Sequence, residues 1–177
     1  MPIVGRFGSL AGLGSLILPG GAMESIATVS VGSGVSTATL SAIPSTFQHQ
    51  QVRLNIAPQG WMNIRPNGTA PVITHRLYGD GSSAGAASYS TTYNGIVTFP
   101  STTYRTVAIV DILDYASTSK TKTLRVFAGM DENGAGSVEL ISHLYNSTTA
   151  ITSLDFVLAL GGSLGQSGAI SLYGLRS

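Results

Sequence analysis

Apolar and polar side chains alternate along most of this 177-residue chain. From Glu24 onward, apolar residues recur at every second position, and this alternation predicts β-strands with one buried face. We therefore expect about nine or ten short strands, and no segment outside the N-terminal arm shows the spacing of a helix. The clearest runs are Ile26 to Val31, Ala38 to Leu40, Val52 to Ile56, Val72 to Leu77, Thr106 to Leu113, Thr123 to Phe127, Val138 to Leu144, Ile151 to Leu160 and Ala169 to Leu175.

Short clusters of glycine, asparagine, aspartate and proline separate these runs, as expected for tight turns. Many short antiparallel strands joined in this way predict an all-β fold, an antiparallel β-sandwich, and the irregular loop lengths favour a jelly-roll-like form. Residues 79–92 contain mostly glycine, alanine and serine and are predicted to form one long loop. The turn clusters are Gly32-Ser33-Gly34, Pro58-Gln59-Gly60, Asn67-Gly68, Asp80-Gly81, Asn94-Gly95, Asn133-Gly134 and Gly161-Gly162.

The first 22 residues differ from the rest, because they are apolar and glycine-rich without alternation. We divide the chain into an extended N-terminal arm, residues 1–22, and a sandwich domain, residues 23–177. The apolar stretch is shorter than the roughly 20 residues that span a bilayer, so we expect no membrane contact. Its large apolar side chains would aggregate if exposed, and we expect them to bind a partner. They are Ile3, Val4, Phe7, Leu10, Leu13, Leu16, Ile17 and Leu18.

The last predicted strand carries apolar groups on both faces. Its pleat places Ile170, Leu172 and Gly174 on one face and places Ser171, Tyr173 and Leu175 on the other. One face should meet the core. The other, formed by Ser171, Tyr173 and Leu175, is predicted to contact a neighbouring subunit.

The charge content is low. Asp, Glu, Lys and Arg make up 10% of the chain and the net charge is +1, against roughly 25% charged residues in an average domain. The basic residues form no stripe that could follow a phosphate backbone, so nucleic-acid binding is not expected. The chain has no cysteine, which excludes disulfides and thiolate metal sites.

Residues that could carry catalysis are scattered. His49, His75 and His143 fall on separate predicted strands, and no serine lies in a nucleophile motif. The four carboxylates that could form a glycosidase pair are more simply turn and capping residues; they are Asp111, Asp114, Glu139 and Asp155. We expect no catalytic, metal or cofactor site, and hence not an enzyme.

Six segments resemble, in the same order, a widespread group of virion proteins of tailed bacteriophages. They are Glu24 to Val29 (ESIATV), Ile43 to His49 (IPSTFQH), Asp111 to Tyr115 (DILDY), Lys120 to Thr123 (KTKT), Ala150 to Leu154 (AITSL) and Ile170 to Leu175 (ISLYGL). The resemblance covers roughly residues 24 to 176. It implies a jelly-roll sandwich, usually a homotrimer, that serves as a capsid cement or decoration protein or as a tail-fibre module.

These observations lead to one main hypothesis and one alternative. The main hypothesis is a capsid cement protein on the outer capsid surface of the virion, which stabilises the shell by laying its arm across subunits of the major capsid protein. The alternative is a tail-fibre or receptor-binding module that recognises host surface polysaccharide through the 79–92 loop and Tyr89, Tyr93 and Tyr104.

Overall fold

The computed structural model describes residues 22–90, 95–99, 101–165 and 167–176. Within these residues the chain forms twelve β-strands and no helix. The strands are β1 (Met23–Gly32), β2 (Thr37–Leu40), β3 (His49–Ile56), β4 (Met62–Pro66), β5 (Ile73–Gly79), β6 (Ala84–Tyr89), β7 (Gly95–Val97), β8 (Thr106–Ile112), β9 (Lys122–Asp131), β10 (Gly136–Tyr145), β11 (Leu154–Leu158) and β12 (Ser167–Leu175).

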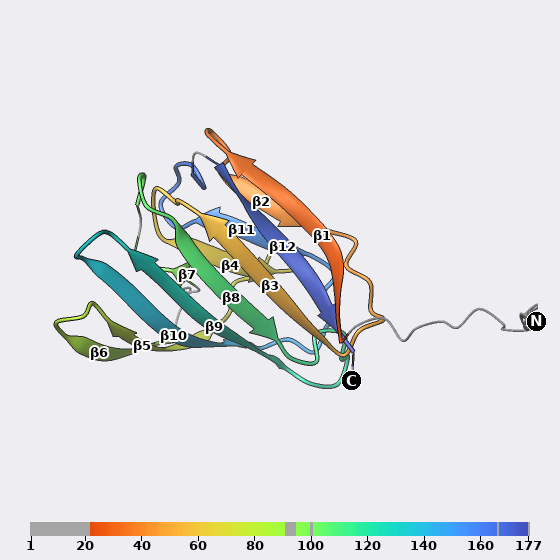
Figure 1. Ribbon diagram of the computed structural model, residues 1–177. Helices are drawn as coiled ribbons and strands as arrows, with labels where there is room; N and C mark the ends of the chain where they lie inside the picture. The colour runs from red at the N-terminus through yellow and green to blue at the C-terminus, as the bar shows by residue number, and fades with distance from the viewer. Residues whose placement is uncertain (1–21, 91–94, 100, 166, 177) are drawn as a thin grey trace, which may run out of the picture.

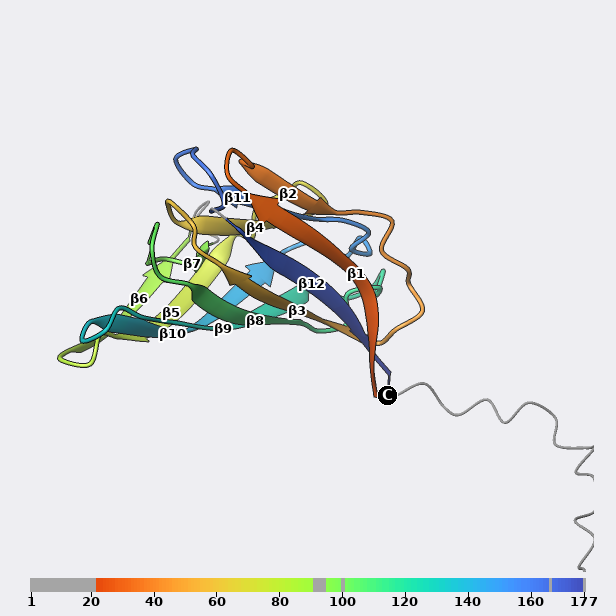
Figure 2. The same ribbon diagram turned by 45° about the horizontal axis from the view of Figure 1, so that its top comes forward.

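The strands form two antiparallel sheets that pack face to face (Figures 1 and 2). The larger sheet has the order β1-β12-β3-β8-β9-β10-β5-β6, and the smaller has the order β2-β11-β4-β7. The smaller sheet lies behind the larger one in Figure 1, so that view looks onto the outer face of the larger sheet. The predicted all-β antiparallel sandwich is confirmed. The jelly-roll form stays a prediction.

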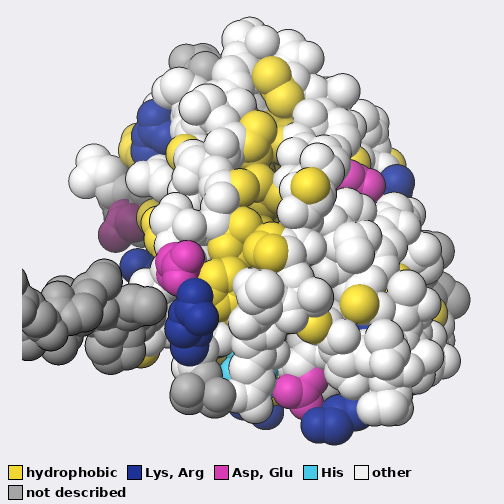
Figure 3. Space-filling model, turned by 90° about the vertical axis from the view of Figure 1, so that its right-hand side faces the viewer, with side chains coloured by type: hydrophobic (Ala, Val, Ile, Leu, Met, Phe, Trp, Pro, Cys, Tyr) yellow, Lys and Arg dark blue, Asp and Glu magenta, His cyan; other side chains and the backbone are white. Residues whose placement is uncertain are grey.

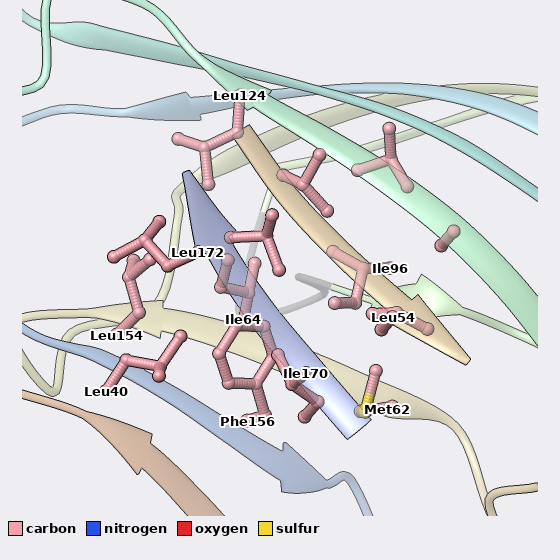
Figure 4. Packing of buried hydrophobic residues seen from close by; sticks show 14 of the residues in the cluster. Leu40, Leu54, Met62, Ile64, Ile96, Leu124, Leu154, Phe156, Ile170 and Leu172 are labelled. Atoms are coloured by element: carbon pink, nitrogen blue, oxygen red, sulfur yellow. The ribbon is translucent and has the colours of Figure 1, made fainter. Parts of the chain in front are cut away.

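Alternation places one face of each sheet in the core (Figure 4). Along β3, Val52, Leu54 and Ile56 are buried while Arg53 and Asn55 are exposed. The inner face of the smaller sheet meets them with Met62, Ile64, Leu154 and Phe156, all fully buried. A buried side chain of this size stabilises the fold by roughly 1.5–3 kcal/mol, so this shared core accounts for the sandwich.

Two turns have the geometry that their sequences predict. Asn133 and Gly134 join β9 to β10, and Asn67 and Gly68 follow β4. In both pairs each residue has a positive φ, between 49° and 111°. Asparagine and glycine tolerate this left-handed conformation, which the tightest hairpin turns require.

The prediction of one long loop over residues 79–92 was wrong. Residues 84–89 form β6, which pairs with β5 from Thr74↔Tyr89 to Gly79↔Ala84. Asp80 closes the hairpin, because its Oδ1 accepts hydrogen bonds from the backbone N–H groups of Ser82 and Ser83. Small residues have low strand propensity, so this strand depends on pairing with its neighbour.

Candidate interaction surfaces

Four of the six segments that carry the resemblance meet at one end of the sandwich, which we call the base, together with the end of ISLYGL and the start of ESIATV. The base consists of the loops 41–48, 113–121 and 146–153 with the chain ends at Ala22 and Arg176. Backbone hydrogen bonds join these segments, among them Ile43 N–H to Thr152 O (3.0 Å), Gln48 N–H to Leu175 O (3.0 Å) and Arg176 N–H to Ala22 O (3.2 Å). Ala22, the residue next to β1, therefore lies in a part of the fold that many contacts hold in place.

Lys122 is the main polar connection inside the base. It is fully buried, and its Nζ donates hydrogen bonds to Ser117 O (2.7 Å), Thr149 O (2.7 Å) and Ser147 O (3.2 Å). Burial lowers the pKa of Lys122. Because an ammonium group has three donors and no acceptor, this side chain satisfies three carbonyls from two loops at once.

Tyr115 and Phe47 form the apolar part of the base. The fully buried Tyr115 donates its hydroxyl hydrogen bond to Pro44 O and accepts one from the Phe47 N–H (3.3 Å). The Phe47 ring lies against Gly174, where a Cβ atom would overlap it. The Arg176 guanidinium lies 5.0 Å from the centre of the same ring. The IPSTFQH and ISLYGL segments thus contact each other directly.

The candidate catalytic carboxylates have separate partners. Asp111 accepts a hydrogen bond from Gln51 Nε2 (2.8 Å), Asp114 from Lys120 Nζ (2.9 Å) and Asp155 from Thr39 Oγ1 (2.7 Å). The Lys120 ammonium lowers the pKa of Asp114 by its hydrogen bond. Glu139 is buried and contacts Arg76 and Thr98. No group of three metal-binding side chains occurs in the described ranges.

The three histidines also lie apart. His49 is at the base, where its Nδ1 accepts a hydrogen bond from the Asp114 N–H (3.0 Å). His75 lies exposed on the outer face of β5, opposite Ser142. His143 is fully buried on the inner face of β10, with its Nδ1 2.8 Å from Thr74 Oγ1. Burial lowers the pKa of His143 to about 4.

His143 should make the domain sensitive to mild acid. The folded protein keeps this imidazole neutral down to about pH 4, whereas the unfolded chain protonates it near 6.5. Unfolding then takes up a proton, so stability should fall as the pH falls from 6.5 to about 4. The expected loss is about 3 kcal/mol, measurable by urea unfolding across this range. His143→Gln should remove this slope and His75→Gln should retain it; an unchanged slope in His143→Gln would contradict the assignment.

The C-terminal strand has the predicted alternation. Ile170, Leu172 and Gly174 are buried, while Ser171, Tyr173 and Leu175 lie half-buried on the outer face. Ser171 Oγ hydrogen-bonds Thr28 Oγ1 (2.9 Å). The Arg53 guanidinium lies 5.4 Å from the centre of the Tyr173 ring. These outer residues have intrachain partners, and the contact of Ser171, Tyr173 and Leu175 with another subunit stays a prediction.

Two other groups of predicted residues lie wholly or partly outside the residues that the structure describes. The eight apolar arm residues, from Ile3 to Leu18, lie outside the described residues. Among the aromatic residues of the alternative hypothesis, Tyr89 is half-buried in β6, Tyr104 is exposed before β8, and Tyr93 lies outside the described residues. Both predictions stay predictions.

Among the described residues, several exposed apolar side chains gather elsewhere, on the outer face of the larger sheet. Cross-strand register places one row of apolar side chains side by side over five adjacent strands. We call it the outer-face row; from β8 to β6 it consists of Ile109, Phe127, Leu140, Leu77 and Ala86.

The outer-face row is well exposed. Phe127 is 58% exposed, Leu77 57% and Leu140 53%, and Val107 and Val138 flank the row at 53% and 47%. Six of the eleven exposed large apolar residues in the described ranges lie on this face, so they form a patch rather than scattered single residues. The row also borders a shallow hollow lined by His75, Leu77, Ala86, Ser88, Arg125, Leu140 and Ser142 with backbone neighbours.

A second apolar zone lies at the side of the sandwich. Figure 3 shows a stripe of hydrophobic side chains on the side where β1 and β2 are the outermost strands of their sheets. On β1, Ile26, Ala27 and Val29 are only partly buried and pack against the core. Because these side chains already contact the core, they expose less apolar surface than the outer-face row.

The sequence contained the signal for the outer-face row. In β9, Leu124 and Val126 stand two positions apart and face the core, whereas Phe127 is the next residue and faces outward. In β10, Ile141 faces the core, whereas Leu140 faces outward. The two-face argument that we applied to the last strand therefore applies more strongly to these two strands.

No family model, curated protein or solved structure matches this chain. The described part of the chain contains no helix that could span a bilayer.

Proposed function

We propose that this chain is a non-enzymatic structural protein that binds other protein subunits in an assembly, as a capsid cement or decoration protein on the outer capsid surface of a tailed bacteriophage. The observation that carries the proposal is the exposed outer-face row on a domain whose core is otherwise well covered. An exposed apolar patch of this kind is typical of a protein–protein contact site. The phage capsid is proposed from the resemblance of the six segments.

The arm supports the same proposal. Its eight large apolar residues precede a domain whose base is held together by hydrogen bonds of Lys122, Tyr115 and Phe47. Burying one such side chain against a partner contributes roughly 1.5–3 kcal/mol before ordering costs. An arm laid across major capsid protein subunits would thus anchor the domain through its base.

Deleting residues 2–20 tests the arm. We expect the shortened protein to fold with an unchanged melting temperature, because the deletion leaves β1 and Ala22 intact. We also expect it to be lost from purified particles, measured as copies per particle by quantitative mass spectrometry. Hundreds of copies of the full-length chain per particle would place it on the shell, and about a dozen would favour the tail-fibre alternative. Retention of the shortened chain at the full-length level would overturn the role of the arm.

A further inference from the structure

Four charged residues frame the part of the outer-face row that lies on β8 and β9. At the end near the base, Asp111 of β8 lies beside its register partner Arg125 of β9. At the other end, Arg105 immediately precedes β8 and Asp131 ends β9. The order of charges across the two strands is therefore acidic then basic at one end, and basic then acidic at the other.

These four residues are placed symmetrically. Ala108 of β8 pairs with Ala128 of β9. Asp111 and Arg105 each lie three positions from Ala108, and Arg125 and Asp131 each lie three positions from Ala128. Three strand residues span about 10 Å. Consider a second copy of the sheet that is rotated by 180° about an axis running across the strands above the alanine pair. Its Asp111 then lies over Arg105 of the first copy, and its Arg125 lies over Asp131.

The apolar side chains fit the same operation. On β9 the half-turn exchanges Phe127 with Gly129, and on β5 it exchanges Leu77 with Gly79. Phe127 and Leu77, the two most exposed side chains of the row, would therefore each face a glycine of the second copy. On β10 the operation exchanges Leu140 with Val138, and on β8 it exchanges Ile109 with Val107.

We infer that the outer-face row docks a second copy of this chain, face to face, with the strands of the two copies running in opposite directions. A contact that a half-turn maps onto itself is the usual way for identical subunits to pair. In this contact Arg125 meets Asp131 of the second copy. Asp111 lies opposite Arg105, whose guanidinium also hydrogen-bonds Ser167 O (2.8 Å) and Ser167 Oγ (2.9 Å) of its own chain. Phe127 fills the space above Gly129 of the second copy. The inference does not depend on the capsid proposal.

The size of the surface sets the strength of the contact. Five strands about 4.8 Å apart and six residues along each strand give a face of roughly 24 by 20 Å. This is below the roughly 800 Å² per partner of a standard stable interface. The free protein should therefore form a reversible dimer with a Kd in about the micromolar to sub-millimolar range.

Sedimentation velocity of the full chain over a range of concentrations tests the inference. We expect a monomer–dimer equilibrium. Arg125→Asp or Asp131→Arg alone should raise the Kd of the dimer by about tenfold or more. The reason is that the twofold symmetry repeats each contact between like charges, so the dimer contains it twice. The double variant Arg125→Asp/Asp131→Arg should restore the Kd to within about threefold of the original. Asp111→Arg and Arg105→Asp form a second exchangeable pair, in case Asp131→Arg disturbs its hairpin turn.

A second variant distinguishes the proposed fit of Phe127 over Gly129 from nonspecific hydrophobic association. Gly129→Leu adds apolar surface to the row, yet it fills the space that Phe127 of the second copy needs. We expect weaker dimerisation, whereas Thr28→Asp, on the polar part of the same face, should leave the Kd unchanged. A monomer at every concentration, an assembly of three subunits as the resemblance implies, stronger association of Gly129→Leu, or no rescue by both charge exchanges would each overturn the inference.

Discussion

Replacing Lys122 with methionine should lower the free energy of unfolding by about 3 kcal/mol, which corresponds to a melting temperature about 10 °C lower. The methionine keeps the approximate length of the side chain but cannot donate a hydrogen bond. The carbonyls of Ser117, Ser147 and Thr149 then lose a shared charged donor in a buried site. Thermal and urea unfolding followed by circular dichroism would measure the loss.

Lys120→Met is the matched control. Lys120 lies two positions away and forms an ion pair with Asp114, but its side chain is 66% exposed. Exposed ion pairs contribute little, so this variant should lose less than about 1 kcal/mol. Equal losses for the two variants would contradict the role assigned to Lys122.

The fold was predictable from the sequence where alternation was regular. The faces of the C-terminal strand follow the pattern, with Ile170 and Leu172 in the core and Tyr173 outside. Alternation failed where a strand has few apolar residues. The β6 strand (Ala84–Tyr89) consists mainly of alanine, glycine and serine, and only its pairing with β5 makes it a strand.

The contacts of the base were not predictable in the same way. Lys122 belongs to a cluster of basic residues in the sequence, and such clusters are usually exposed. Lys122 lies two positions before Leu124 and four before Val126, so the alternation along β9 places all three side chains on the core side. The three carbonyls that it binds come from two loops. Loop conformation, and therefore the partners of this ammonium group, depends on tertiary packing that periodicity does not describe.

The outer-face row shows a different limit. The alternation along each strand indicates that Phe127 and Leu140 point away from the core, but it does not indicate that they are neighbours. Their proximity depends on the register between β9 and β10, in which Phe127 pairs with Leu140. The four-residue turn at Asn133 and Gly134 sets this register. Single exposed apolar residues thus became a candidate interface only once the strands were paired.

Replacing Gly174 with alanine should destabilise the domain by about 2–3 kcal/mol, although alanine is the smallest possible addition. The new Cβ would overlap the Phe47 ring near its attachment point, so rotation of the ring alone cannot relieve the overlap. Arg176 lies over the same ring and Tyr115 bonds the backbone of Phe47, which limits how far it can move. Unfolding by urea would measure the change.

A double-mutant cycle would assign this loss to the Phe47 contact. Phe47→Leu alone removes apolar packing and should cost about 1 kcal/mol. In the double variant Phe47→Leu/Gly174→Ala, the smaller side chain leaves room for the methyl group, so the combined loss should be less than the sum of the two single losses. Gly129→Ala is the control, because a Cβ there meets its nearest neighbour, Ser137 O, at an ordinary 3.6 Å. Additive losses in the cycle, or an equal loss in Gly129→Ala, would show that Gly174 is required for a reason other than its contact with Phe47.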